Sequence, residues 1–225
     1  MRSRRLPMFV LPLALAGCIF GGGGERREPR RATPTGLAPA RSAAPEDRET
    51  RLCLKRMTDR GFDFRSLPDR HFSGGCSAVG SVQLLDIGTP VTNLGAMRCG
   101  LAEAFSGWVR YGVVPAARQY LGSEVEKVES FGTYACRGTV GTGRATRLSE
   151  HAVSNAVDIA AFQLADGRRI SVLDDWGGSD ADAKAFLRAI HASACRRFGT
   201  VLGPGYNAAH RNHFHMDMSG SHFCR

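Results

Sequence analysis

The sequence predicts an α+β fold, in which a small antiparallel sheet is flanked by helices and stabilised by disulfides. The chain has 225 residues, 43% of them hydrophobic, which suits one domain with a substantial core. Its 27 Gly and 10 Pro favour a loop-rich fold over a helical bundle. Apolar residues recur at helical spacing in some segments and at every second position in others, so both element types are expected.

The first 17 residues have the features of a bacterial lipoprotein signal peptide. Three arginines precede an apolar stretch, residues 8–16, that is too short to span a bilayer. The stretch ends in Leu-Ala-Gly-Cys18, which resembles a lipobox and implies cleavage before Cys18 and diacylation of that residue. We expect a lipid-anchored, periplasm-facing protein of the cell envelope, and Ile19 favours the outer membrane over the inner. The alternative is an ordinary signal peptide with an incidental cysteine.

Residues 18–48 are expected to form the lipidated Cys18 and a flexible linker, and residues 49–225 the folded domain. The linker has four glycines at residues 21–24 and continues with Arg, Pro, Ala and Thr, without apolar periodicity. A flexible chain of this length has an r.m.s. end-to-end distance of about 30 Å. Such a linker would hold the folded domain away from the lipid surface.

Six cysteines remain when Cys18 is set aside, and in an exported chain they are most simply read as three disulfides. The sequence contains no CxxC pair, which argues against a cysteine zinc site. Sequence alone does not choose among the possible pairings. As a working hypothesis we take the pairs Cys76–Cys99, Cys136–Cys195 and Cys53–Cys224.

Several elements of the domain are expected from local patterns. We expect strands over residues 81–84 and 125–134, and helices that begin at Asn93, Pro115 and Ser179 or Asp180. The second helix should end at Gly122. Two of the helices carry apolar stripes, which are Met97, Leu101, Phe105 and Trp108 in the first and Phe186, Leu187, Ile190 and Ala194 in the last. These stripes are interpreted as core.

From Ala156 onward, the segment 149–159 surrounds a single carboxylate, Asp158, with apolar residues. In a strand, Val157 and Ile159 face one way, and Asp158 faces the other between two alanines that leave room beside it. A buried aspartate costs several kcal/mol unless a charge or a metal compensates it. Together with the nearby His151, Asp158 is therefore a candidate metal ligand.

The segment 210–218 carries the strongest alternation in the chain. In an extended conformation His213, His215 and Asp217 project from one face, while Phe214, Met216 and Met218 project from the other into the core. Two imidazoles and one carboxylate suit Zn²⁺ with a fourth position open, and zinc lowers the pKa of bound water to about 7. The simpler alternative is that these histidines are ordinary core or surface residues.

The net charge of +9 raises the possibility of a nucleic-acid partner. The basic residues are scattered, however, and lipidation would place the domain outside the cytoplasm. A mildly basic surface suits an acidic polymer such as a cell wall at least as well. We therefore expect no nucleic-acid partner.

From about Leu52 to Arg225 the sequence resembles the bacterial extensin-like C-terminal domain family. The supporting phrases occur in order: Leu67-Pro68-Asp69, Gly75-Cys76, Tyr134-Ala135-Cys136-Arg137, Ser149-Glu150-His151, Ala156-Val157-Asp158-Ile159, Leu202-Gly203-Pro204-Gly205-Tyr206-Asn207, His213-Phe214-His215 and Phe223-Cys224-Arg225. The resemblance implies a fold more readily than an activity, because the family has little settled biochemistry.

Two of these phrases are in turn similar to the S-x-H-x-x-G-x-A-x-D and H-x-H motifs of zinc D-alanyl-D-alanine carboxypeptidases and related peptidoglycan endopeptidases. The similarity implies that His151, Asp158 and His215 bind zinc and that His213 is catalytic. Arg137 would lie near the substrate carbonyl or oxyanion, and Ser149 and Asp217 are candidate supporting residues. The implied partner is a peptidoglycan peptide substrate, and the implied activity is hydrolysis of stem-peptide amide bonds.

The chain departs from these motifs at one position. Ser154 replaces the motif glycine, which would cost about 1 kcal/mol if the position needs a positive φ. In addition Asn212 stands where a related subgroup has a glutamate base, so the H-x-H subgroup is favoured. A wall-associated binding or structural lipoprotein that keeps the fold without catalysis is the alternative to an enzyme.

Overall fold

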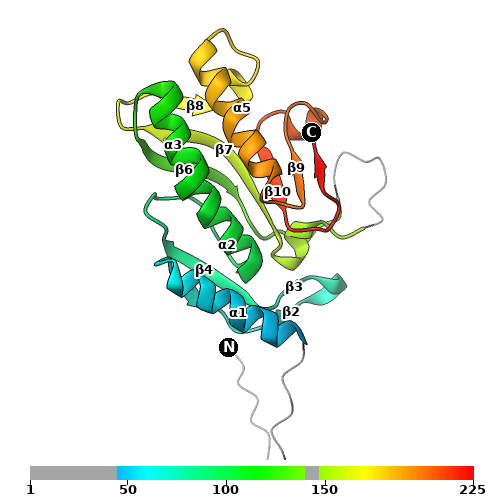
Figure 1. The fold of residues 1–225 in the computed structure, drawn as a ribbon. Coiled ribbons are helices and arrows are strands. Elements are labelled where there is room, and N and C mark those ends of the chain that lie inside the picture. The colour runs from blue at the N-terminus through cyan, green and yellow to red at the C-terminus, as the bar shows by residue number, and fades with distance from the viewer. Residues whose placement is uncertain (1–44, 140–146) are drawn as a thin grey trace, which may run out of the picture. The chain divides into compact units, whose positions relative to one another are not determined.

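The computed structural model describes residues 45–139 and 147–225 (Figure 1). The expected signal peptide, the lipidation of Cys18 and nearly all of the linker lie outside these residues. Among the described helices, none combines the length and apolar character needed to cross a membrane.

The predicted mixture of helix and sheet is confirmed. The largest sheet has six strands, in the order β11-β9-β10-β7-β6, and β8 pairs with β7. Its neighbouring strands are antiparallel except for β11, which pairs parallel to β9. The strands are β6 (Val125–Gly132), β7 (Ala156–Leu164), β8 (Arg169–Ser171), β9 (Thr200–Leu202), β10 (Phe214–Asp217) and β11 (Phe223–Cys224).

Two smaller sheets lie nearer the start of the domain. One has the order β1-β4-β5, and the other is the β2–β3 hairpin. Their strands are β1 (Asp63–Ser66), β2 (Arg70–His71), β3 (Ser77–Ala78), β4 (Ser81–Asp86) and β5 (Met97–Arg98). The strand predicted over 81–84 is therefore present as β4.

The helices differ in part from the prediction. They are α1 (Pro45–Asp59), α2 (Cys99–Trp108), α3 (Val114–Ala116), α4 (Val172–Asp175) and α5 (Ala181–Cys195), with π segments η2 (Val109–Val113) and η3 (Ala117–Leu121), and 3₁₀ turns η1 (Ser73–Gly75), η4 (Glu150–Val153) and η5 (Ala208–His210). Asn93 does not cap the first predicted helix, because α2 begins only after β5 and Asn93 has a positive φ of 58°.

The second predicted helix is not separate from the first. Residues 99–121 form one helical run, and the proline expected to begin a new helix lies inside it, at the start of α3. Proline has no N–H to donate to the preceding turn, and the run is π-helical on both sides of α3. Gly122 ends the run as predicted, with the left-handed φ of 63° that glycine adopts without strain.

The core lies between the helical run, α5 and the large sheet. Asp180 caps α5 by accepting hydrogen bonds from the backbone N–H groups of Asp182 and Ala183 at 2.9 and 3.0 Å. Of the two predicted starts, Ser179 and Asp180, the second is therefore the cap. The predicted apolar stripe of α5 is buried. The indole N–H of Trp108 donates to the carbonyl of Ile190 at 2.9 Å, so α2 and α5 are joined by a buried hydrogen bond.

Three disulfides are present, as expected, but all three pairings taken as the working hypothesis are wrong. The bonds are Cys53–Cys99, Cys76–Cys136 and Cys195–Cys224. The first joins α1 to the start of α2, and these helices pack against each other. The second joins the β2–β3 hairpin to the segment after β6, and the third joins the end of α5 to β11. The way the elements pack decides which cysteines pair, and the spacing of cysteines along the sequence does not reveal that packing.

Candidate metal centre

The predicted ligands come from two adjacent strands and one short turn. β7 and β10 pair antiparallel with His215 directly opposite Asp158. His151 lies on η4, which leads into β7. The hydroxyl of Ser149 accepts a hydrogen bond from the His151 backbone N–H at 3.3 Å and so caps this turn. Ser154 ends the turn with a φ of 57°, which is the left-handed conformation that the motif glycine was expected to supply.

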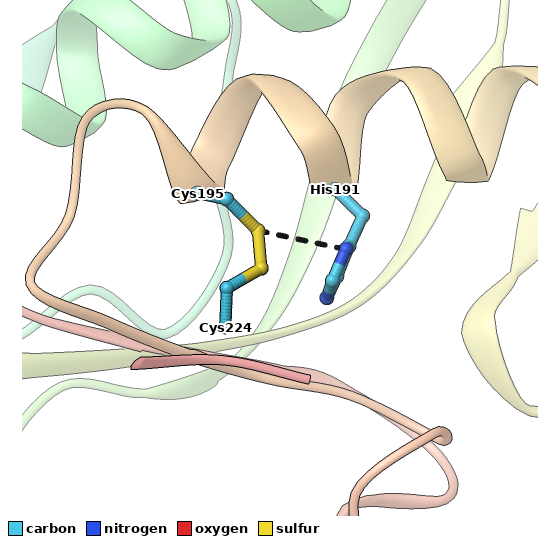
Figure 2. A group of neighbouring side chains, drawn as sticks. All are labelled: His191, Cys195 and Cys224. Carbon is cyan, nitrogen blue, oxygen red and sulfur yellow. Dashed lines mark hydrogen bonds between the residues drawn. A yellow bond between two sulfur atoms is a disulfide. The ribbon is translucent and has the colours of Figure 1, made fainter. Parts of the chain in front are cut away.

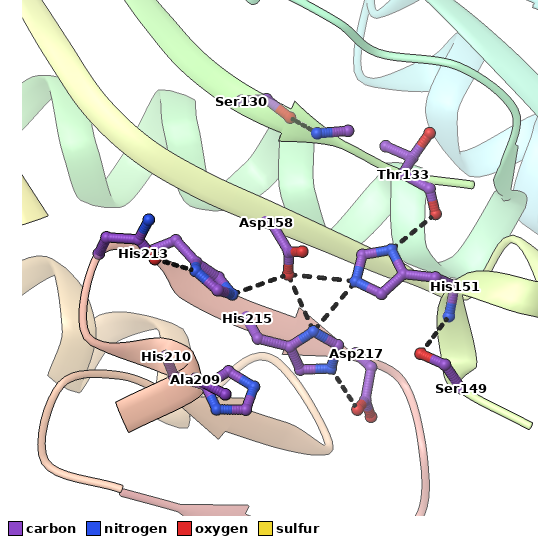
Figure 3. A network of polar contacts seen from close by, with 12 residues as sticks. Ser130, Thr133, Ser149, His151, Asp158, Ala209, His210, His213, His215 and Asp217 are labelled. Atoms are coloured by element: carbon purple, nitrogen blue, oxygen red, sulfur yellow. Dashed lines mark hydrogen bonds and ion pairs between the residues drawn. The ribbon is translucent and has the colours of Figure 1, made fainter. Parts of the chain in front are cut away.

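The side chains of His151, Asp158 and His215 meet at one point (Figure 3). His151 Nε2 lies 3.1 Å and His215 Nδ1 lies 2.9 Å from the same oxygen, Asp158 Oδ1. The two ring nitrogens are 3.1 Å from each other. Ligand atoms at about 2.0–2.1 Å from a tetrahedral zinc ion are about 3.3–3.4 Å apart, so this triangle has nearly the size of one face of a zinc site.

The outer nitrogen of each imidazole fixes which inner nitrogen is free to bind a metal. His151 Nδ1 lies 3.0 Å from the carbonyl oxygen of Thr133, and His215 Nε2 lies 3.0 Å from Asp217 Oδ2. Both oxygens can only accept, so we assign the hydrogens to these outer nitrogens. In neutral imidazoles, the lone pairs of His151 Nε2 and His215 Nδ1 then face the Asp158 carboxylate. Such outer partners are typical of metal-binding histidines.

The buried Asp158 carboxylate and the two imidazoles are electrostatically coupled. Burial alone raises the pKa of Asp158, but the adjacent imidazoles of His151 and His215 outweigh burial and hold that pKa well below its usual range. For His215 burial lowers the pKa, yet hydrogen bonds with Asp158 and Asp217 raise it to about 9. Without a metal, a protonated His215 therefore supplies the positive charge that faces His151 Nε2 and Asp158 Oδ1.

His213 lies beside this triangle and outside it. Its Nε2 is 3.6 Å from Asp158 Oδ1, and its Nδ1 is 2.9 Å from the side-chain oxygen of Asn212, so Nδ1 carries the hydrogen. The ring is half-buried, and burial lowers the pKa of His213. The Phe131 ring packs edge-on against it, with centroids 5.7 Å apart. His213 thus presents Nε2 to the ligand cluster.

A pocket of about 800 Å³ opens over the cluster. Its lining includes the three candidate ligands, His213, Asp217, Ser149 and Arg137. Arg137 is exposed and directly precedes Gly138, which forms an isolated antiparallel bridge with Leu148. The predicted site residues therefore share one pocket. Met218, predicted to pack into the core, is instead 38% exposed, because β10 ends one residue earlier.

Sequence reasoning missed His210, which also lines the pocket. It lies on η5, its Nδ1 is 2.7 Å from the side-chain oxygen of Asn207, and its ring centroid is 5.2 Å from that of His213. Burial is the main cause that lowers the pKa of His210 to about 4. The spacing of three histidines at 210, 213 and 215 was the only available signal, and the strand alternation does not extend to the first of them.

A second group of potential ligands is His191, Cys195 and Cys224 (Figure 2). His191 Nδ1 lies 3.7 Å from the Cys195 sulfur, but that sulfur is bonded to Cys224. Metal binding by cysteine requires the free thiolate. In its oxidised form this group is therefore a disulfide beside a histidine, and the His151–Asp158–His215 triangle is the candidate metal centre.

Comparison with known protein families matches residues 51–225 to the family described as "Extensin-like protein C-terminus". The match covers the folded domain almost completely, and it includes both motifs that form the candidate metal centre. Searches of curated proteins and of solved structures found no match.

Proposed function

The chain belongs to the extensin-like C-terminal family, and from this premise we propose that it is a zinc peptidase of the cell envelope that hydrolyses amide bonds of peptidoglycan stem peptides. The observation that carries the proposal is the triangle of His151 Nε2, Asp158 Oδ1 and His215 Nδ1, whose sides are 2.9–3.1 Å. The triangle lies at the base of a substrate-sized pocket.

The donor set has the composition of a catalytic zinc site. Two neutral imidazoles and one carboxylate leave a coordination position open, whereas structural zinc sites use four protein ligands. Both imidazoles are oriented by buried partners, the Thr133 carbonyl and the Asp217 carboxylate. Zinc bound here would supply Lewis-acid polarisation of an amide carbonyl and an acidified water.

The remaining steps fall to residues of the chain. The Asn212 side chain holds the hydrogen of His213 on Nδ1, so Nε2 is free to accept a proton from the attacking water and to pass it to the leaving amine. Arg137, on the pocket wall, is the candidate cation for the negative charge that develops on the carbonyl oxygen. The buried Ser149 holds the His151 turn in place through its hydroxyl.

We place this activity at a membrane surface facing the cell wall. Lipidation of Cys18 would anchor the chain, and the linker would let the domain reach its polymeric substrate. Two acyl chains hold a protein on a bilayer far more firmly than one, because each buried CH₂ contributes ~0.8 kcal/mol. The sorting residue Ile19 favours the outer membrane.

One observation favours the non-catalytic alternative, a wall-binding lipoprotein that keeps the fold. Hydrogen bonds can hold His215 in place without a metal, since a protonated His215 donates to both Asp158 and Asp217. In that case the same residues would stabilise the strand pair β7–β10 only. Zinc content near zero after purification in the presence of the metal would support this alternative.

The direct test is an assay of the purified, zinc-loaded protein on muropeptides of varied stem and cross-link structure, with and without a chelator. We expect cleavage that the chelator abolishes and zinc restores. His213→Ala should retain zinc but lose most activity, whereas His71→Ala, an exposed histidine on β2, is the matched control and should be fully active. Failure of the zinc-loaded protein to cleave any of these substrates would refute the peptidase.

A further inference from the structure

A second pocket, of about 610 Å³, lies beside the metal centre. Its walls come from three places: the β2–β3 hairpin with the residues before it, the loop 93–96, and residues 131–134 at the end of β6. Neither the family match nor the proposed chemistry assigns a role to this pocket. Its lining residues are Leu67, Pro68, Arg70, Phe72, Ala78, Asn93, Gly95, Ala96, Phe131, Gly132, Thr133 and Tyr134.

The strip 131–134 separates this pocket from the metal centre and contacts both. Phe131 and Thr133 line the pocket, while the Phe131 ring packs against His213 and the Thr133 carbonyl accepts the hydrogen bond from His151. The two pockets are therefore no more than one residue layer apart. Through these contacts the strip links the second pocket to both His151 and His213.

The pocket is held open by covalent and close backbone contacts. The disulfide Cys76–Cys136 ties the hairpin wall to the segment that follows the strip. On the opposite side the Gly95 N–H donates to Thr133 Oγ1 at 3.0 Å, and a Cβ at this position would lie only 3.2 Å from that oxygen. Glycine thus lets the loop 93–96 approach the strip closely. A pocket fixed in this way is preformed, as ligand sites usually are.

The lining is aromatic and almost uncharged. Phe72 is 42% exposed and Phe131 is 57% exposed, which are large values for residues of this size beside a functional pocket. Phe72 and Tyr134 form a tilted pair with ring centroids 5.4 Å apart. Among the lining residues Arg70 alone carries a formal charge, and no acid lines the pocket.

We propose that this pocket binds an N-acetylated sugar ring of the glycan strand, so that the substrate is a glycan-linked peptide and not a free one. The inference rests on the proposed function for the identity of the polymer. Stem peptides consist of small and charged residues, which offer no large apolar group to these rings. A pyranose ring and its acetyl methyl present C–H faces that pack on Phe72 and Tyr134, and its acetyl and hydroxyl oxygens accept hydrogen bonds from Arg70.

The test is binding of an N-acetylglucosamine tetramer, which contains no peptide, to Asp158→Asn protein, measured by NMR titration and calorimetry. This background removes cleavage, so pocket binding is measured by itself. We expect saturable binding with resonance shifts at Phe72, Phe131 and Tyr134. Phe72→Ala combined with Tyr134→Ala should weaken binding at least tenfold. Phe72→Leu keeps apolar volume without a ring and should weaken it as well, which guards against misfolding of the double variant.

Tyr111→Ala is the matched control, because Tyr111 is 56% exposed on η2 and lines neither pocket. It should bind the tetramer like the parent protein. Absence of binding at millimolar tetramer, or binding that the pocket variants do not change, would overturn the inference. Tetramer binding by a protein that cleaves no muropeptide would refute the peptidase alone, while equal cleavage of free and glycan-linked peptides without tetramer binding would refute the sugar site alone.

Discussion

Replacing Asp217 by asparagine removes one negative charge behind the candidate metal ligand His215 without changing the size of the side chain. Asp217 is buried, and its two oxygens accept one hydrogen bond each, from His215 Nε2 at 3.0 Å and from the Ser219 backbone N–H at 2.8 Å. Asparagine has a single oxygen, so its amide N–H₂ must face one of these two donors. Where it faces His215, the imidazole hydrogen moves to Nδ1 and blocks metal binding.

Loss of such an outer partner typically weakens metal binding tenfold to a hundredfold, which corresponds to about 1.4–2.8 kcal/mol. We expect the upper half of this range, because the substitution removes the charge and also disfavours the binding tautomer. Competition against a chromophoric chelator measures the zinc affinity of each variant. Ser219→Ala keeps the backbone N–H and should bind zinc like the parent protein. Equal zinc affinity of Asp217→Asn and the parent would refute the assignment of His215 as a ligand through Nδ1.

Three further predictions follow from the site. His213→Ala should lower kcat by about 10²–10⁴-fold with zinc affinity nearly unchanged, because this imidazole transfers protons and is not a ligand; loss of zinc together with activity would contradict that role. Zinc affinity should fall up to tenfold per pH unit as the pH drops below about 9, because zinc must then displace the proton that the raised pKa keeps on His215; chelator competition across pH measures this, and a flat profile would count against it. Ser154→Gly should leave the free energy of unfolding nearly unchanged, because relief of about 1 kcal/mol of left-handed strain offsets loss of the buried hydrogen bond to the Ser77 carbonyl. Ser154→Ala loses the bond without relieving the strain and should be about 1 kcal/mol less stable in denaturant titrations; equal stability of the two variants would show that the strain is absent.

The convergence of the three candidate ligands was predictable in part from strand patterns and in part from a motif resemblance. Asp158 and His215 lie on strands, whereas His151 lies on the 3₁₀ turn η4 and was identified through the motif resemblance. Alternation along β10 places His215 and Asp217 on one side of the strand, and the alanines beside Asp158 mark an approachable carboxylate in β7. The pairing that sets His215 opposite Asp158 then needs only that the two strands be neighbours. Ser154 adopts the positive φ expected of the motif position, so the substitution of glycine changes the strain and not the shape of the turn.

The disulfides and the helix boundaries were not predictable in the same way. Cysteine spacing carries no information on whether α1 packs on α2 or α5 ends beside β11, and those contacts choose the pairs. Asn93 is a good capping residue by type, but β5 uses the residues after it for sheet pairing with β4. Hydrogen bonding to a neighbouring strand outweighed a local helix preference there.

His210 and the aromatic pocket were missed because both depend on residues brought together only by the fold. His210 lies on a 3₁₀ turn, outside the period-2 pattern that identified His213 and His215. Phe72 and Tyr134 are separated along the chain and become neighbours through the hairpin and the disulfide beside it. Neither residue belongs to an apolar stripe that sequence periodicity could detect.

The most direct test of the metal centre is anomalous X-ray diffraction at the zinc absorption edge, from crystals of the zinc-loaded protein. The account predicts one strong peak per chain, about 2.0–2.1 Å from His151 Nε2, His215 Nδ1 and a carboxylate oxygen of Asp158. A protein that takes up zinc elsewhere, or leaves these three atoms hydrogen-bonded to one another at saturating zinc, would contradict it.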